Sequence, residues 1–223
     1  MELLHCVYEP EGEGPHPTIL ALHGRGANAM DLLGLAPHLC GGAFRVICPQ
    51  APLEVALGPG MTGYAWFPMS LGGEIDTAAF LSARDRLRTF LDQCTRRYAA
   101  DGGKLVLLGF SQGGGMAYSL GLSDPDRFAG MCVLSSWLRE GTLDALEVSD
   151  GVDSLQTLVQ HGTRDELIEL ARAKHSITLL EKLHVPVDYR EYDMGHEITS
   201  RSLADLSAWL QEKVPAHYKI YAR

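Results

Sequence analysis

Short unbroken apolar runs alternate along this chain with longer segments in which apolar residues recur every three or four positions. Runs such as Thr18–Leu22 are apolar at consecutive positions, which is typical of parallel strands covered on both faces. Segments such as 75–100 have the spacing of an amphipathic helix. Because the two patterns alternate to the C-terminus, the sequence predicts an α/β fold with a mostly parallel central sheet and helices on both faces.

The boundaries of the elements follow from the points where these patterns begin and end. The expected strands are 3–8, 18–22, 44–49, 105–108, 128–135, 155–162 and 187–192, and the expected helices are 30–39, 75–100, 116–122, 167–183 and 198–213. Segment 53–73 is rich in glycine and proline and is expected to form a long irregular loop. A single domain over residues 1–223 is expected, without a separate lid domain, because the connections between strands are short.

The charge balance narrows the class of partner. Nineteen Lys and Arg against 28 Asp and Glu give a formal net charge of -9, and no basic run occurs. We therefore expect a small-molecule substrate, no nucleic acid and no stable membrane insertion. Five cysteines without C-x-x-C spacing, and an N-terminus without a basic signal region, favour a reducing, cytoplasmic location. A homodimer remains open.

The candidate nucleophile lies where an apolar strand meets a helix. Gly109-Phe110-Ser111-Gln112-Gly113 matches G-x-S-x-G in the strand–turn–helix setting that defines a nucleophile elbow. Glycines are needed on both sides, because side chains there would crowd neighbouring elements around a strained serine backbone. Ser111 is therefore the predicted nucleophile of a serine hydrolase.

A serine hydroxyl needs a base, and in this fold the chain order is nucleophile, acid, histidine. Downstream of Ser111, His196 is the histidine that follows a predicted strand directly on a glycine-containing loop. Asp165 follows the preceding strand, where a carboxylate can orient that histidine. The alternatives for the acid are Glu166, Asp193 and Asp144.

Acyl transfer also needs backbone donors for the developing oxyanion. The amide of Gln112 is one candidate, and the open loop at Gly24, Arg25 and Gly26 offers a second. No P-loop lysine follows that loop, and no histidine has metal-ligand spacing to acidic or cysteine partners. We therefore expect neither a metal nor a cofactor.

Together these motifs resemble the phospholipase/carboxylesterase family of α/β-hydrolases, which includes the acyl-protein thioesterases. The resemblance spans about residues 17–213 and is carried by 22–26, 49–52, Trp66-Phe67, 109–114, His161-Gly162 with Asp165, and Gly195-His196. It implies an α/β-hydrolase fold, a Ser111–His196–Asp165 triad, oxyanion donors at the amides of Arg25 and Gln112, and a site bordered by Trp66. The sequence departs from the family after the acid, where Glu166-Leu167-Ile168 stands in place of the usual valine-proline, so the conformation of that loop is open.

The predicted function is cleavage of carboxylic esters through an acyl-enzyme. Trp66, Phe67 and Met69 are expected to line a pocket for short to medium acyl chains. An acyl-protein thioesterase or a lysophospholipase is the alternative, because the same machinery attacks any activated acyl carbonyl. A hydrolase-like ligand-binding protein without turnover is the alternative from another class.

Overall fold

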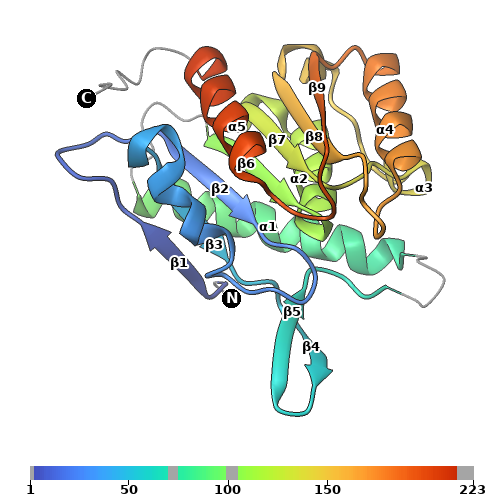
Figure 1. The fold of residues 1–223 in the computed structure, drawn as a ribbon, viewed down its shortest axis with the longest axis horizontal. Helices are drawn as coiled ribbons and strands as arrows, with labels where there is room; N and C mark the ends of the chain where they lie inside the picture. Colours follow the sequence, from blue (N-terminus) through green and yellow to red (C-terminus); the bar gives the residue numbers. More distant parts are fainter. Residues whose placement is uncertain (1–2, 70–74, 99–104, 215–223) are drawn as a thin grey trace.

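The computed structural model describes residues 3–69, 75–98 and 105–214, which are built around a seven-stranded sheet (Figure 1). The strands, in sheet order, are β1 (His5–Tyr8), β3 (Arg45–Pro49), β2 (Thr18–Leu22), β6 (Leu105–Phe110), β7 (Phe128–Leu134), β8 (Thr157–Gly162) and β9 (Val187–Tyr192). All neighbours are parallel except β1, which pairs antiparallel with β3 at one edge. The mostly parallel sheet predicted from the apolar runs is therefore confirmed.

Helices cover both faces of the sheet. Against one face pack α1 (Thr77–Arg97), α2 (Gln112–Ser123) and α4 (Leu170–Lys182), and against the other pack α5 (Ser200–Lys213) and the 3₁₀ helix η1 (Leu32–His38). The central strands β2 and β8 are buried at every position, as their continuous apolar pattern requires. The described residues contain the short helix α3 (Glu140–Leu143) and no separate lid domain.

Two predicted elements differ in the structure. Segment 30–39 forms the 3₁₀ helix η1, not an α-helix, and Pro37 lies inside it, where it lacks the N–H that an α-helix would need. The first part of the expected irregular loop is an antiparallel hairpin, β4 (Leu53–Gly58) and β5 (Met61–Ala65), which projects from the body of the molecule (Figure 1). The glycines of this segment indicate irregular structure by sequence alone. Gly58 and Gly60 instead have positive φ and belong to the tight turn between the two strands.

Other boundaries shift by a few residues. The elbow strand continues to Phe110 and α2 begins at Gln112, because the glycines after Ser111 are already helical. Residues 70–73 of the expected loop and 99–100 of the expected helix lie outside the described residues. The five cysteines are free thiols. Within the described residues, no helix has the length and apolar character to span a bilayer.

Candidate active site

Ser111 joins β6 to α2 in a tight turn that forces its backbone into an unusual conformation. Its φ of 53° and ψ of -118° lie outside the regions that an L-residue normally occupies. A Cβ on Gly109 would lie 2.4 Å from the carbonyl oxygen of Gly113, and one on Gly113 would lie 2.0 Å from that of Leu22. The two flanking glycines are therefore sterically required, and the strained turn directs Ser111 into a cavity.

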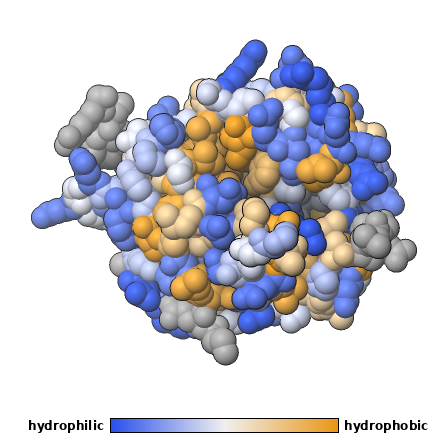
Figure 2. Space-filling model, turned by 60° about the horizontal axis from the view of Figure 1, so that its bottom comes forward, coloured by the Kyte–Doolittle hydropathy of each residue, from blue (hydrophilic) through white to orange (hydrophobic). Residues whose placement is uncertain are grey.

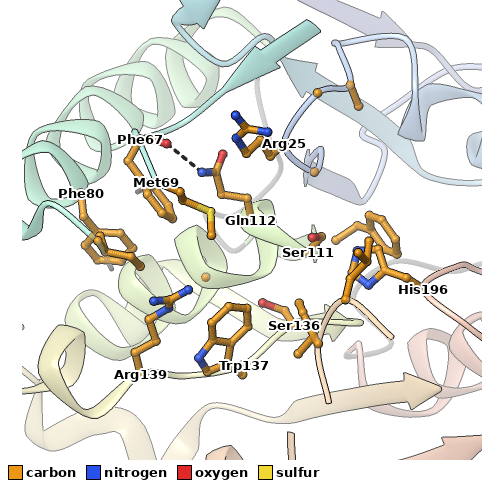
Figure 3. Close-up of a pocket in the computed structure, with 18 of the residues that line it drawn as sticks. Arg25, Phe67, Met69, Phe80, Ser111, Gln112, Ser136, Trp137, Arg139 and His196 are labelled. Carbon is orange, nitrogen blue, oxygen red and sulfur yellow. Dashed lines mark hydrogen bonds between the residues drawn. The ribbon is translucent and has the colours of Figure 1, made fainter. Parts of the chain in front are cut away.

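His196 lies on the loop after β9 and lines the same cavity as Ser111, on the same side of it (Figure 3). Its Nδ1–H donates to Oδ2 of Asp165 at 2.8 Å. The other oxygen of Asp165 accepts from the backbone N–H groups of Leu167 and Ile168, at 2.9 and 2.8 Å. The buried carboxylate is thus held at both oxygens, and Nε2 of His196 is left available to take a proton.

The alternative acids are placed away from this pair. Glu166 and Asp144 are exposed, and Asp193 is an exposed residue that pairs with Arg164 at 2.7 Å. Within the described part of the chain, Asp165 is the carboxylate that is hydrogen-bonded to His196.

The loop after Asp165 is held by a histidine that the sequence interpretation placed in a strand and left without a role. Nε2–H of the fully buried His161 donates to the carbonyl oxygen of Ile168 at 2.8 Å, and the same atom lies 3.5 Å from Oδ2 of Asp165. The loop at 166–168, where the sequence departs from the family pattern, is therefore held by the carboxylate of Asp165 and by the side chain of His161. The sequence feature that could have indicated a role for His161 was the His161-Gly162 pair at the end of β8.

A second histidine-glycine pair, His23-Gly24, fixes the direction of a peptide in the loop after β2. Nε2 of His23 accepts from the N–H of Ala51 at 3.1 Å, so the proton must be on Nδ1, which donates to the carbonyl oxygen of Gly24 at 2.7 Å. Burial lowers the pKa of His23 and so favours this neutral form. In a trans peptide the C=O and the next N–H point in opposite directions. The bond from His23 therefore turns the N–H of Arg25 the other way.

The side chain of Gln112 connects the elbow to the segment after β5. Its Oε1 accepts from the N–H of Trp66 at 2.8 Å, and its Nε2 donates to the carbonyl oxygen of Phe67 at 2.8 Å (Figure 3). The indole N–H of Trp66 donates to the carbonyl oxygen of His23 at 2.9 Å. Trp66 is therefore buried beneath the loop and is not among the residues that line the cavity, whereas Phe67 and Met69 line it.

The hairpin β4–β5 supports the same loop from the other side. The N–H of Gly26 donates to the carbonyl of Tyr64 at 2.8 Å, and the N–H of Tyr64 donates to the carbonyl of Ala27 at 2.9 Å. A Cβ on Gly63 would lie 2.0 Å from the oxygen of Gly26, so only glycine permits this approach. The loop that carries Arg25 is thus held by strand-like bonds to the hairpin as well as by the bond from His23 to Gly24.

The cavity has a volume of about 690 Å³ and a largely apolar wall. Figure 2 shows apolar side chains gathered around a hollow in this face of the molecule. Its apolar lining includes Phe67, Met69, Ile75, Phe80, Phe110, Trp137, Leu138, Leu167 and Ile168. Ser111 and His196 therefore both line a pocket with a mainly apolar wall, which is the usual character of a site for a small molecule. No group of three or more metal-ligating side chains occurs among the described residues.

The model of the phospholipase/carboxylesterase family matches residues 5–214 of this chain. The chain belongs to that family. Acyl-protein thioesterase 1 of Mycosarcoma maydis is 26% identical over 228 residues, covering 92% of this chain and 94% of that protein. Acyl-protein thioesterase 1 of Gibberella zeae is 30% identical over 182 residues, covering 75% and 74% of the two chains.

Among solved structures, the carboxylesterase of Bacillus cereus superposes with a TM-score of 0.80 at 23% identity, covering 95% of this chain and 94% of that one. The predicted α/β-hydrolase fold is thereby confirmed. Membership of the family confirms the predicted enzyme class, an esterase-type hydrolase.

Proposed function

We propose that this hydrolase cleaves carboxylic esters through an acyl-enzyme formed on Ser111, with His196 as the base and Asp165 as the residue that orients it. The observation that carries the proposal is the 2.8 Å bond to the buried Asp165 from His196, which lines the same cavity as the strained Ser111. That arrangement is the one a serine hydroxyl needs to become a nucleophile.

The reaction follows from these positions. Nε2 of His196 accepts the proton of the Ser111 hydroxyl as Oγ attacks the ester carbonyl, and the same atom returns that proton to the leaving alcohol. Water then attacks the acyl-enzyme as His196 takes its proton, and the bond to Oγ of Ser111 breaks as His196 returns that proton to Oγ, which releases the carboxylic acid. Asp165 holds the tautomer in which Nδ1 carries hydrogen, so that Nε2 is free to accept.

Two backbone amides are proposed to stabilise the oxyanion. Gln112 is the first residue of α2, so its N–H is one of the donors that a helix leaves without an intrahelical partner. The second is the N–H of Arg25, which the His23–Gly24 bond turns away from the oxygen of Gly24, in a loop that lines the cavity. Each such donor contributes about 3 kcal/mol of transition-state stabilisation.

We further propose a preference for short to medium acyl chains, with Phe67 and Met69 in contact with the chain. Each added methylene gains about 0.8 kcal/mol only while apolar wall remains to receive it. In Figure 3 the guanidinium of Arg139 lies across the cavity from Ser111, and a long neutral chain that reached it would have to desolvate it. Trp66 would act indirectly, through its bond to His23.

Thioester cleavage is the second candidate, because two relatives at 26% and 30% identity are named acyl-protein thioesterase 1. A panel of matched p-nitrophenyl esters, acyl thioesters and lysophospholipids on the purified protein would rank these activities. Labelling by a fluorophosphonate, compared between the wild type and Ser111→Ala, tests for a reactive serine and would expose a binding protein without turnover. A cytoplasmic location, a single domain and the absence of a cofactor stay predictions, and a homodimer stays open.

A further inference from the structure

Ser136 is a second serine in the wall of the cavity that Ser111 lines. It follows the end of β7, one residue after Ser135, whose positive φ of 45° turns the chain sharply. The N–H of Ser111 donates to the carbonyl oxygen of Leu134 at 3.0 Å, so the ends of β6 and β7 are tied together at the elbow. In Figure 3 the side chain of Ser136 lies between Ser111 and Trp137. Ser136 is therefore placed on the cavity wall beside the proposed nucleophile.

Gly114 allows Ser136 to lie close to the start of the elbow helix. A Cβ on Gly114 would lie 2.5 Å from Cβ of Ser136 and 2.7 Å from its Oγ, so the close approach of these two residues depends on glycine. The N–H of Gly114 donates to the carbonyl oxygen of Ser111 at 2.9 Å. The side chain of Ser136 is therefore packed against the first turn of α2, the turn that begins directly after the nucleophile.

The hydroxyl of Ser136 has no hydrogen-bond partner within the part of the chain that the structure describes, although the residue is only 2% exposed. Other buried serines do have one. The hydroxyl of Ser119 donates to the carbonyl oxygen of Met116 at 2.9 Å. The hydroxyl of Ser176 donates to that of Arg172 at 2.9 Å. Because a buried hydroxyl without a partner costs free energy, a group that completed the hydrogen bonds of Ser136 inside the cavity would be favoured there.

The other polar side chains of the lining are bonded, exposed or further along the wall. Gln112 uses both of its polar side-chain atoms in bonds to the backbone. Two charged residues are exposed, and two polar residues belong to the wall shared with a second cavity of about 670 Å³: Arg25 and Asp31, and Arg139 and Thr142. An alkyl chain lying along Ser136 would cover its hydroxyl without pairing it, whereas an oxygen on that chain would pair it.

We propose that Ser136 binds an oxygen substituent on the acyl group, so that the Ser111 site takes hydroxyacyl esters in preference to plain alkanoyl esters of the same length. A serine hydroxyl offers one donor and two acceptor positions, and an alcohol on the acyl chain offers the same set in return. Because Ser136 lies beside the nucleophile, the matching hydroxyl is on the second or third carbon of the acyl chain, with the carbonyl as the first. The inference rests on the proposed function, because it names the class of ester that this site takes.

The test measures kcat/KM for p-nitrophenyl 3-hydroxybutyrate, as separate R and S enantiomers, and for p-nitrophenyl butyrate. The ratio of the hydroxy ester to butyrate is compared between the wild type and Ser136→Ala, which cancels the different intrinsic reactivities of the two esters. We expect this ratio, for the better enantiomer, to be about fivefold higher in the wild type than in Ser136→Ala. The difference should come mainly from a lower KM, as one neutral hydrogen bond of ordinary strength would produce.

The two enantiomers separate a direct contact from a general structural effect. A hydroxyl fixed on one side of the cavity meets only one of the two configurations well, so the wild type should prefer one enantiomer by about threefold or more. Ser136→Ala should lose that preference. If the alanine variant lowered kcat/KM equally for both enantiomers and for butyrate, Ser136 would have a structural role only and the proposal would be wrong.

Ser135→Ala is the matched control, because it removes the same group one residue earlier in the chain. The hydroxyl of Ser135 is likewise buried and unpaired among the described residues, but Ser135 is absent from the described lining of the cavity. This variant should keep the wild-type ratio and enantiomer preference. Ser136→Cys, which is a weaker donor and acceptor of similar shape, should give an intermediate ratio. Thermal melting of each variant establishes that the compared proteins are folded.

The outcomes for the two proposals are distinct. If the wild type hydrolyses the butyrate ester and Ser111→Ala does not, the esterase function stands, and a ratio that Ser136→Ala leaves unchanged would overturn the hydroxyacyl preference alone. If neither ester is turned over, the esterase function fails. Equilibrium titration of the two intact esters into the wild type and Ser136→Ala would then decide the contact with Ser136 directly, with equal affinities counting against it.

Discussion

The imidazole of His23 donates to the carbonyl oxygen of Gly24 at 2.7 Å, and this bond sets the direction of the peptide that ends at the nitrogen of Arg25. His23 is itself held by the N–H of Ala51, and its own carbonyl accepts from the indole of Trp66. The proposed oxyanion donor is thus oriented by a buried side chain that is not among the residues lining the cavity.

We expect His23→Ala to lower kcat by about 10- to 100-fold with a smaller change in KM, because an oxyanion donor that can rotate away loses part of its contribution of about 3 kcal/mol. Steady-state kinetics on p-nitrophenyl butyrate would measure both constants. His38→Ala, at an exposed position on η1, is the control and should keep the wild-type values. A folded His23→Ala protein with full kcat would contradict the positioning role.

The same histidine should make the fold sensitive to acid. Burial lowers the pKa of His23 in the folded state, whereas in the unfolded chain it titrates near about 6.5. As pH falls below about 6.5, the unfolded state therefore binds a proton that the folded state does not, and the free energy of unfolding decreases by up to about 1.4 kcal/mol per pH unit. Urea unfolding between pH 7 and 5 should show this slope, and His23→Asn should reduce it. Identical slopes in the two proteins would remove His23 as the cause.

Ser111→Ala should abolish turnover and fluorophosphonate labelling while leaving the protein folded. Alanine keeps the Cβ that the elbow already accommodates and removes only the hydroxyl, so the melting temperature should change by no more than about 2 °C. Hydrolysis and thermal melting are measured on the same preparation. Retention of most of the wild-type kcat would mean that another group is the nucleophile.

The acid can be tested with two neighbouring substitutions. In Asp165→Asn the amide oxygen can still accept from Leu167 and Ile168, but the NH₂ group then faces Nδ1 of His196 and favours the tautomer that cannot take a proton from Ser111. We expect kcat to fall by about 10⁴-fold. Glu166→Gln changes an exposed side chain and should stay within about twofold of the wild type. The reverse ranking would transfer the role to Glu166.

For neutral p-nitrophenyl esters we expect kcat/KM to peak at short to medium acyl length. Each methylene that packs against the apolar wall near Phe67 and Met69 lowers the free energy of binding, until the chain reaches Arg139. Met69→Ala should flatten the rising side of that profile. Arg201→Gln, at an exposed position on α5, is the control and should keep the wild-type profile. A steady rise of kcat/KM from acetate to palmitate would exclude the proposed length limit.

The sequence by itself determined the scaffold and the order along the chain of the proposed catalytic groups. Strands Thr18–Leu22 and Val187–Tyr192 have the predicted bounds, and the elbow, the histidine loop and the acid loop all follow the strands that were expected to carry them. These features depend on local sterics and on continuous apolar runs, which are properties of neighbouring residues. The glycines of segment 53–73 were misread because one residue type serves both irregular loops and tight hairpin turns.

Only the tertiary structure decided which side chains support the site. The amide of Gln112 was expected to matter, but its side chain bonds residues 45 and 46 positions away, and His23 reaches a backbone group 28 positions away. Arg139 and Arg172 belong to different elements and meet only because the chain folds both onto Trp137. Such contacts depend on the packing of distant segments, and no periodicity or local motif in the chain encodes them.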